Sequence, residues 1–107
     1  MASSLEFVEY VCDQMEDAGM ITYKRMFGEF GVYCNGKIIG LICEDQLFVK
    51  PTQAGAIVWE GLSMAPPYPG AKPYYVIESL DDRSKLTDFV IETYKALPEP
   101  KPKKKKV

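Results

Sequence analysis

The first segment of the chain has the hydrophobic periodicity of an amphipathic helix. Between residues 4 and 18, apolar side chains recur every three or four positions and acidic side chains fill most of the others, which predicts a helix with an acidic outer face. Ser3, followed three positions later by Glu6, fits a capping box. Gly19 is a natural stop. The apolar stripe consists of Leu5, Val8, Val11, Cys12, Met15 and Ala18.

Residues 21–50 change to a pattern typical of β-strands, rich in β-branched and aromatic side chains. Asn35-Gly36 indicates a hairpin, because these residues tolerate the positive φ that a type I′ turn needs, and Glu44-Asp45 marks a second, weaker turn. Gly28, Gly31 and Gly40 favour β-bulges or the close packing of a helix. Four antiparallel strands are therefore expected, near residues 21–27, 29–34, 37–43 and 46–50.

The second half of the chain predicts a short helix, one more strand and a final helix. Thr52 is a candidate cap for a short apolar helix that Gly61 closes. Residues 64–73 contain four prolines and a glycine, which argues against a regular element there. Residues 74–79 have the composition of a strand. Asp81 or Asp82 is expected to cap the last helix, which Pro98 terminates and whose apolar stripe is Leu86, Phe89, Val90, Thr93, Tyr94 and Leu97.

This order of elements predicts an α+β fold of two layers. An antiparallel sheet of about five strands is expected, with both long helices on one face. The 107 residues fit one domain. We assign residues 1–98 to that domain and residues 99–107 to a flexible, lysine-rich tail.

The formal net charge of −2 conceals a split between these two parts. Residues 1–98 carry eight basic and fourteen acidic side chains, a net charge of −6, whereas residues 99–107 carry a net charge of +4. Three interpretations of the tail are open. It contacts nucleic-acid phosphates, it acts as a nuclear localisation signal, whose lysine-rich core it resembles, or it is a solvated tail that aids solubility. Its basic residues are Lys101, Lys103, Lys104, Lys105 and Lys106.

Composition excludes several classes of function. The chain has no His, which removes Ser-His-Asp and Cys-His triads and zinc sites of the zincin type. Its three Cys residues form no CxxC pair, and neither a signal peptide nor a membrane-spanning run is visible. We therefore expect the protein to be located in a reducing cytoplasm. We expect no metal and no cofactor, because ligand clusters and glycine-rich nucleotide motifs are lacking. An enzyme with an unrecognised small-molecule pocket is the least favoured alternative.

Two segments contain candidate binding residues. Arg25 is either an anion-contacting residue or the partner of a structural ion pair with one of the acidic side chains, such as Glu78 or Asp82. In the proline-rich loop, Tyr68 and Lys72, together with Tyr74, are candidates for a recognition surface, whereas the alternative is a stiff crossover whose tyrosines fill the core. Tyr74 and its neighbour point to opposite faces in a strand, so only one of them joins a given surface.

Several motifs taken together resemble the N-terminal domain of the TfoX/Sxy proteins. They are Arg25-Met26-Phe27-Gly28-Glu29-Phe30-Gly31-Val32-Tyr33, Asn35-Gly36-Lys37, Leu47-Phe48-Val49-Lys50, Pro67-Tyr68-Pro69-Gly70-Ala71-Lys72-Pro73-Tyr74-Tyr75 and Leu80-Asp81-Asp82. Glu29 stands where members of that family often have Gly.

The resemblance implies a secretion-chaperone-like α+β domain in a bacterial cytoplasm. The family's best-known members regulate natural competence at promoters with the cyclic-AMP receptor protein, and they carry a second domain, whereas this sequence ends in the lysine tail. The expected function is a non-enzymatic module that binds a protein partner, such as the transcription machinery. An exposed strand edge or the short helix would also allow a homodimer.

Overall fold

A six-stranded antiparallel sheet carries the fold, with its strands in the order β1-β2-β3-β4-β6-β5. The computed structural model describes residues 3–26 and 28–98, so the candidate tail lysines lie outside the described residues. The elements are α1 (Leu5–Gln14), the 3-10 turn η1 (Glu16–Ala18), β1 (Ile21–Met26), β2 (Glu29–Cys34), β3 (Lys37–Cys43), β4 (Gln46–Val49), α2 (Gln53–Val58), β5 (Met64–Ala65), β6 (Tyr74–Ile77) and α3 (Arg83–Ala96). The α+β prediction is confirmed.

The sixth strand corrects the expectation that residues 64–73 hold no regular element. Met64 pairs with Tyr75 and Ala65 with Tyr74, and the amide of Val76 donates to the carbonyl of Ser63 at 2.9 Å. This pairing is sterically allowed because both residues of β5 precede the first proline and keep their N–H groups. The proline-rich segment therefore begins as a short edge strand and becomes a loop only afterwards.

The start of α1 differs from the predicted capping box. Ser4, not Ser3, caps the helix, because its hydroxyl accepts a hydrogen bond from the amide of Phe7 at 3.1 Å. The Ser3 amide donates to Glu29 at 2.9 Å, and its hydroxyl accepts from the amide of Asp45 at 2.8 Å. The predicted box is wrong because partners from distant strands hold Ser3.

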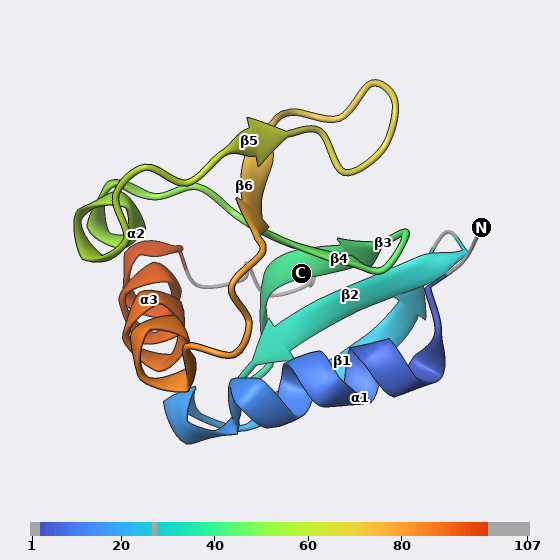
Figure 1. Ribbon diagram of the computed structural model, residues 1–107, viewed down its shortest axis with the longest axis horizontal. Coiled ribbons are helices and arrows are strands. Elements are labelled where there is room, and N and C mark those ends of the chain that lie inside the picture. Colours follow the sequence, from blue (N-terminus) through green and yellow to red (C-terminus); the bar gives the residue numbers. More distant parts are fainter. Residues whose placement is uncertain (1–2, 27, 99–107) are drawn as a thin grey trace, which may run out of the picture.

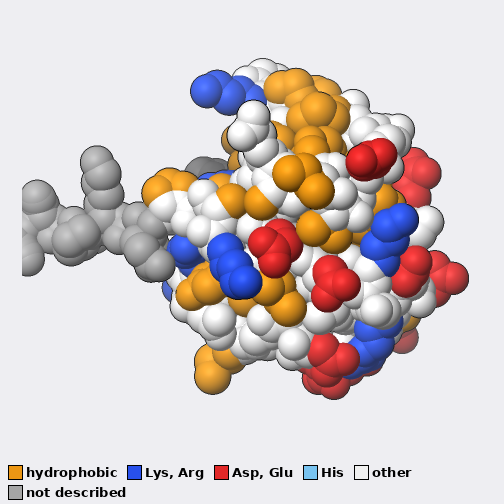
Figure 2. Space-filling view, turned by 90° about the vertical axis from the view of Figure 1, so that its left-hand side faces the viewer, with side chains coloured by type: hydrophobic (Ala, Val, Ile, Leu, Met, Phe, Trp, Pro, Cys, Tyr) orange, Lys and Arg blue, Asp and Glu red, His pale blue; other side chains and the backbone are white. Residues whose placement is uncertain are grey.

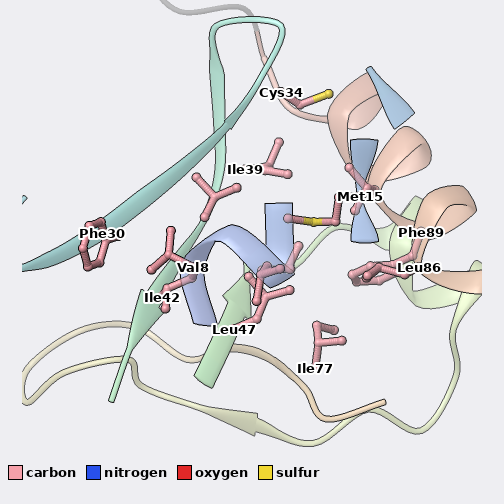
Figure 3. Packing of buried hydrophobic residues seen from close by; sticks show 14 of the residues in the cluster. Val8, Met15, Phe30, Cys34, Ile39, Ile42, Leu47, Ile77, Leu86 and Phe89 are labelled. Atoms are coloured by element: carbon pink, nitrogen blue, oxygen red, sulfur yellow. The ribbon is translucent and has the colours of Figure 1, made fainter. Parts of the chain in front are cut away.

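Both long helices pack on one face of the sheet, as predicted. Figure 1 shows α1 and α3 on the same side of the strands, with the loop after β5 on the other side. Figure 3 shows Val8 of α1, Met15 directly after that helix, and Leu86 and Phe89 of α3 directed toward the sheet residues, among them Ile39. All five are fully buried. The helical spacing of the apolar residues and the alternation in the strands thus meet in one core.

The predicted turns form as expected. Asn35 and Gly36 have φ values of 51° and 86°, as a type I′ turn requires, and Glu44 and Asp45 also have positive φ. Of the glycines, Gly40 lies beside a bulge in β3, where the register shifts opposite Val32 and Tyr33. A Cβ atom at Gly40 would lie 2.2 Å from the carbonyl oxygen of Phe48, so a neighbouring strand, rather than a helix, makes the close approach.

A buried lysine connects the sheet to the end of α3. Lys37, only 5% exposed, donates from its Nζ to the carbonyls of Tyr94 at 3.0 Å and Leu97 at 2.8 Å. The ammonium also lies 4.3 Å from the centroid of the Tyr94 ring. Because the last carbonyls of a helix have no partner within it, this lysine satisfies them and complements the negative end of the helix dipole.

Candidate functional site

An apolar groove of about 550 Å³ lies on the face of the sheet that the helices leave uncovered. Residues of β1, β2 and β3 supply most of its lining, and the residue after β4, the proline-rich loop and the start of β6 supply the rest. The register places Phe48 between Leu41 and Val76 on this face. The groove is lined by Met26, Glu29, Phe30, Ile38, Leu41, Cys43, Lys50, Tyr68 and Tyr74.

A second, smaller hydrophobic cluster lies on the groove's side of the sheet. Cys43, Phe48 and Val76 are its buried members, and Leu41, Ala65 and Tyr74 pack against them. Without cover, these apolar side chains would be exposed to water on an open sheet face. The loop of residues 66–73 lies on this side of the sheet in Figure 1. Tyr68 of this loop lines the groove, which is therefore a concave site with apolar walls.

The structure brings Tyr68 and Tyr74 together in the lining of one groove, and their role in recognition stays a prediction. Both line the groove, while Tyr75 points to the opposite face and packs edge-on against Phe89, with ring centroids 6.1 Å apart. Burial first, and then the nearby Tyr68, raise the pKa of the Tyr74 phenol above its ordinary value. The Tyr74 phenol therefore stays neutral at pH 7 and can donate a hydrogen bond.

Glu29 places a negative charge on the groove wall. Partial burial alone would raise the pKa of Glu29, but hydrogen bonds from the amides of Glu44 and Ser3 outweigh it and lower that pKa. The two carboxylate oxygens accept from Ser3 and Glu44, each at 2.9 Å. Glu29 is therefore ionised near neutral pH and ties the N-terminal segment to the β3–β4 turn.

Lys50 also lines the groove, and sequence reasoning did not select it. Its backbone amide donates to the carbonyl of Ile39 at 2.9 Å, but among the described residues its ammonium forms neither an ion pair nor a hydrogen bond. Lys50 directly follows β4, in which Phe48 faces the groove side of the sheet. The period-two alternation from Phe48 is the signal that would have placed Lys50 on this face.

The other two candidate residues do not join the groove. Arg25 pairs with Phe30 across β1 and β2, and its guanidinium carbon lies 5.0 Å from the centroid of the Phe30 ring. Within the described ranges it makes no ion pair with Glu78 or Asp82, so that structural alternative is wrong. Lys72 is exposed on the loop and is not part of the groove lining.

A different arginine pairs with acidic side chains at the end of α1 and in η1. Arg83, at the start of α3, lies 3.2 Å from Glu16, 3.3 Å from Asp17 and 3.8 Å from Asp13. These exposed pairs connect α3 to α1 and η1, and Asp82 caps α3 through a 3.3 Å hydrogen bond from the amide of Lys85. Figure 2, which faces α2 and α3, shows the acidic side chains gathered mainly on one side and hydrophobic side chains in the upper half.

Cys34 and Cys43 are buried and Cys12 is half-buried, so burial suppresses the thiolate form of each. Burial and the nearby Glu9 raise the pKa of Cys12 to about 11, and burial also raises the pKa values of Cys34 and Cys43. All three are free thiols. In the described part of the chain, no group of three or more Cys, Asp or Glu side chains is arranged to hold a metal ion, and no helix has the length and apolar character to cross a bilayer.

Comparison with known proteins identifies relatives of the whole domain. The family model described as the TfoX N-terminal domain matches residues 13–97. An uncharacterized 12.7 kDa protein in the trpE 5′ region of Spirochaeta aurantia is 36% identical over 107 residues, which covers 99% of this chain and 93% of that protein. The match extends over the strands, the proline-rich loop and α3, and so includes the groove.

Proposed function

The chain belongs to the TfoX N-terminal domain family, and from this membership we propose that it is a non-enzymatic module that binds a protein partner in transcriptional regulation. The competence regulators that the sequence resembles act at promoters, which favours the bacterial cytoplasm as its setting. The proposal locates recognition at the loop of residues 66–73 and the rim of the groove beneath it.

The exposed Tyr68 at the rim of an apolar groove is the observation that carries this proposal. Its side chain is 52% exposed although it also lines the groove. The loop is held in place by the buried Pro67 and by a turn in which the amide of Ala71 donates to the carbonyl of Tyr68 at 3.1 Å. Rigid tyrosines beside a hydrophobic depression are typical centres of protein interfaces, because they add contact area at a small entropic cost. Lys72, exposed on the same loop, adds a positive charge.

Affinity capture from the native cell with three baits tests the proposal. The baits are the unchanged protein, Tyr68→Ala and the control Tyr10→Ala, which removes a tyrosine of similar exposure, 44%, from α1 on the other side of the sheet. We expect one partner to be retained by the unchanged protein and by Tyr10→Ala, and its affinity, measured with purified proteins, to fall at least tenfold for Tyr68→Ala. Equal retention by all three baits, or equal loss from both variants, contradicts the proposed surface.

A second candidate function rests on the charge split between the domain and its tail. Five lysines within residues 99–107, on a body of net charge −6, favour contact with the phosphates of nucleic acid. Replacing Lys101, Lys103, Lys104, Lys105 and Lys106 by Gln should remove binding to duplex DNA and its dependence on salt. Unchanged DNA affinity at two salt concentrations would exclude the tail as the binding element.

A further inference from the structure

The two charged side chains that line the groove differ in one important respect. Glu29 has its carboxylate oxygens occupied by backbone amides, whereas the Lys50 ammonium has no partner among the described residues. We propose that the groove is a binding site for a small monocarboxylate with an apolar body, whose carboxylate pairs with Lys50. This inference concerns the interior of the groove and stands apart from the protein partner proposed at its rim.

The size and lining of the groove suit such a ligand. Small-molecule sites are usually concave, about 300–1,000 Å³ in volume and mostly apolar, with a few polar groups that orient the ligand. The groove has a volume of about 550 Å³, and Met26, Ile38, Leu41 and Cys43 supply apolar side chains from β1 and β3. An alkyl or aryl body would thus replace water against these walls, and the hydrophobic effect would supply most of the affinity.

The polar groups at the Lys50 end favour an anion. Lys50 is partly buried, so a carboxylate beside it would form a charge-assisted hydrogen bond in surroundings that are partly shielded from water. Lys50 follows Val49, which pairs with Tyr75, so Lys50 and Tyr74 adjoin at neighbouring ends of β4 and β6. The hydroxyls of Tyr74 and Tyr68 also line the groove and are additional hydrogen-bond donors for an anion.

Glu29 at the other end limits the ligand to one carboxylate. It lies near Cys43 and Glu44 at the far end of β3, whereas Lys50 lies near the Gly40 end. Three residues of strand separate Gly40 from Cys43, which is about 10 Å at roughly 3.3 Å per residue. A second carboxylate on an extended ligand would approach the ionised Glu29 and be repelled. The charge pattern therefore selects against dicarboxylates. A cation is repelled by Lys50, and both oxygens of Glu29 already accept hydrogen bonds from backbone amides.

Titration of the full-length protein with four probes, each built on a straight chain of eight carbons, tests this inference. Octanoate, octanol, octyltrimethylammonium and the dicarboxylate suberate share an apolar chain and differ only in their polar ends. We expect octanoate to bind with one-to-one stoichiometry by calorimetry and to shift the amide resonances of β3, β4 and residues 66–74 in NMR spectra. The other three probes should bind at least tenfold more weakly.

Two matched lysine variants identify the responsible cation. Lys50→Met should remove the preference for octanoate over octanol, whatever its effect on the affinity for octanol itself. Lys72→Met, which changes an exposed lysine outside the lining, should keep the preference. Thermal melting confirms that both variants fold. The inference is wrong if no probe binds, if octanoate and octanol bind equally to the unchanged protein, or if the shifts map elsewhere. It is also wrong if the protein forms a dimer whose groove residues are protected and the groove takes up no octanoate.

Discussion

Replacement of Lys37 by Met tests whether the end of α3 depends on a side chain from the sheet. Met has a similar apolar length, so the substitution keeps most of the packing of the stem and removes the ammonium. The variant loses both hydrogen bonds, to the carbonyls of Tyr94 and Leu97, and the contact with the Tyr94 ring. The carbonyls at the last turn of the helix are then left without this donor.

The expected loss of stability follows from these contacts. A hydrogen bond to a charged group contributes about 1.5–3 kcal/mol, and a cation at a helix C-terminus about 0.3–1 kcal/mol at exposed sites. The contributions overlap because one ammonium makes all of them, and Met regains some free energy by burying an apolar group. We therefore expect the free energy of unfolding to fall by about 2–4 kcal/mol. For a domain of this size, each kcal/mol lost lowers Tm by about 4–8 °C.

Urea unfolding followed by the fluorescence of Trp59, which packs edge-on against Phe89 of α3, measures this change. The matched control is Lys95→Met, because Lys95 lies in the last turn of the same helix with its side chain 67% exposed. The control should change the free energy of unfolding by less than about 0.5 kcal/mol. If both variants unfold at the same urea concentration, the buried lysine does not stabilise the end of α3 and the reasoning fails.

Three further predictions follow from the same structure. Gly40→Ala forces a Cβ against the carbonyl of Phe48, so we expect a loss of at least about 1–3 kcal/mol in urea unfolding; an unchanged midpoint would contradict the close approach. Because the pKa of Glu29 is lowered, the contribution of this carboxylate to folding stability is fully present above the ordinary carboxyl pKa and is lost as the pH falls through the folded-state pKa. The difference in the free energy of unfolding between the unchanged protein and Glu29→Gln should therefore shrink on acidification. A difference that does not depend on pH would refute this. With the pKa of Cys12 at about 11, a disulfide reagent at pH 7.5 should modify the native thiols far more slowly than those of the urea-unfolded protein, and equal rates would argue against their burial.

Local chemistry accounts for the parts of the fold that were predicted correctly. The meander strands end within about a residue of their predicted bounds, because Asn35-Gly36 and Glu44-Asp45 determine both turns through their own backbone preferences. Thr52 and Asp82 cap α2 and α3, as expected, through bonds to amides three residues away. Ser3 shows where local reasoning fails, because its partners, Glu29 and Asp45, are distant in sequence.

The candidate site was predicted only in part. Tyr68 and Tyr74 share one surface because a loop and the strand after it return to the same sheet face. Lys50, Leu41 and Ile38 were missed, since a side chain becomes part of a groove only when strand register aligns it with others. The proposed ion pairs of Arg25 did not form. Its strand instead turns the guanidinium toward the Phe30 ring.

The amino-acid sequence by itself determined the family, the α+β class, the turns of the meander, the caps at the start of α2 and α3 and the end of α3. These depend on interactions within a few residues, where spacing and side-chain chemistry are sufficient. Only the tertiary structure decided that Lys37 supports α3, that Arg83 pairs with the acidic face of α1, and that Lys50 lies without a partner in an apolar groove. Each of these contacts joins segments that are far apart in the chain. The contacts form only when the strands have paired in their register and the helices have packed on one face of the sheet.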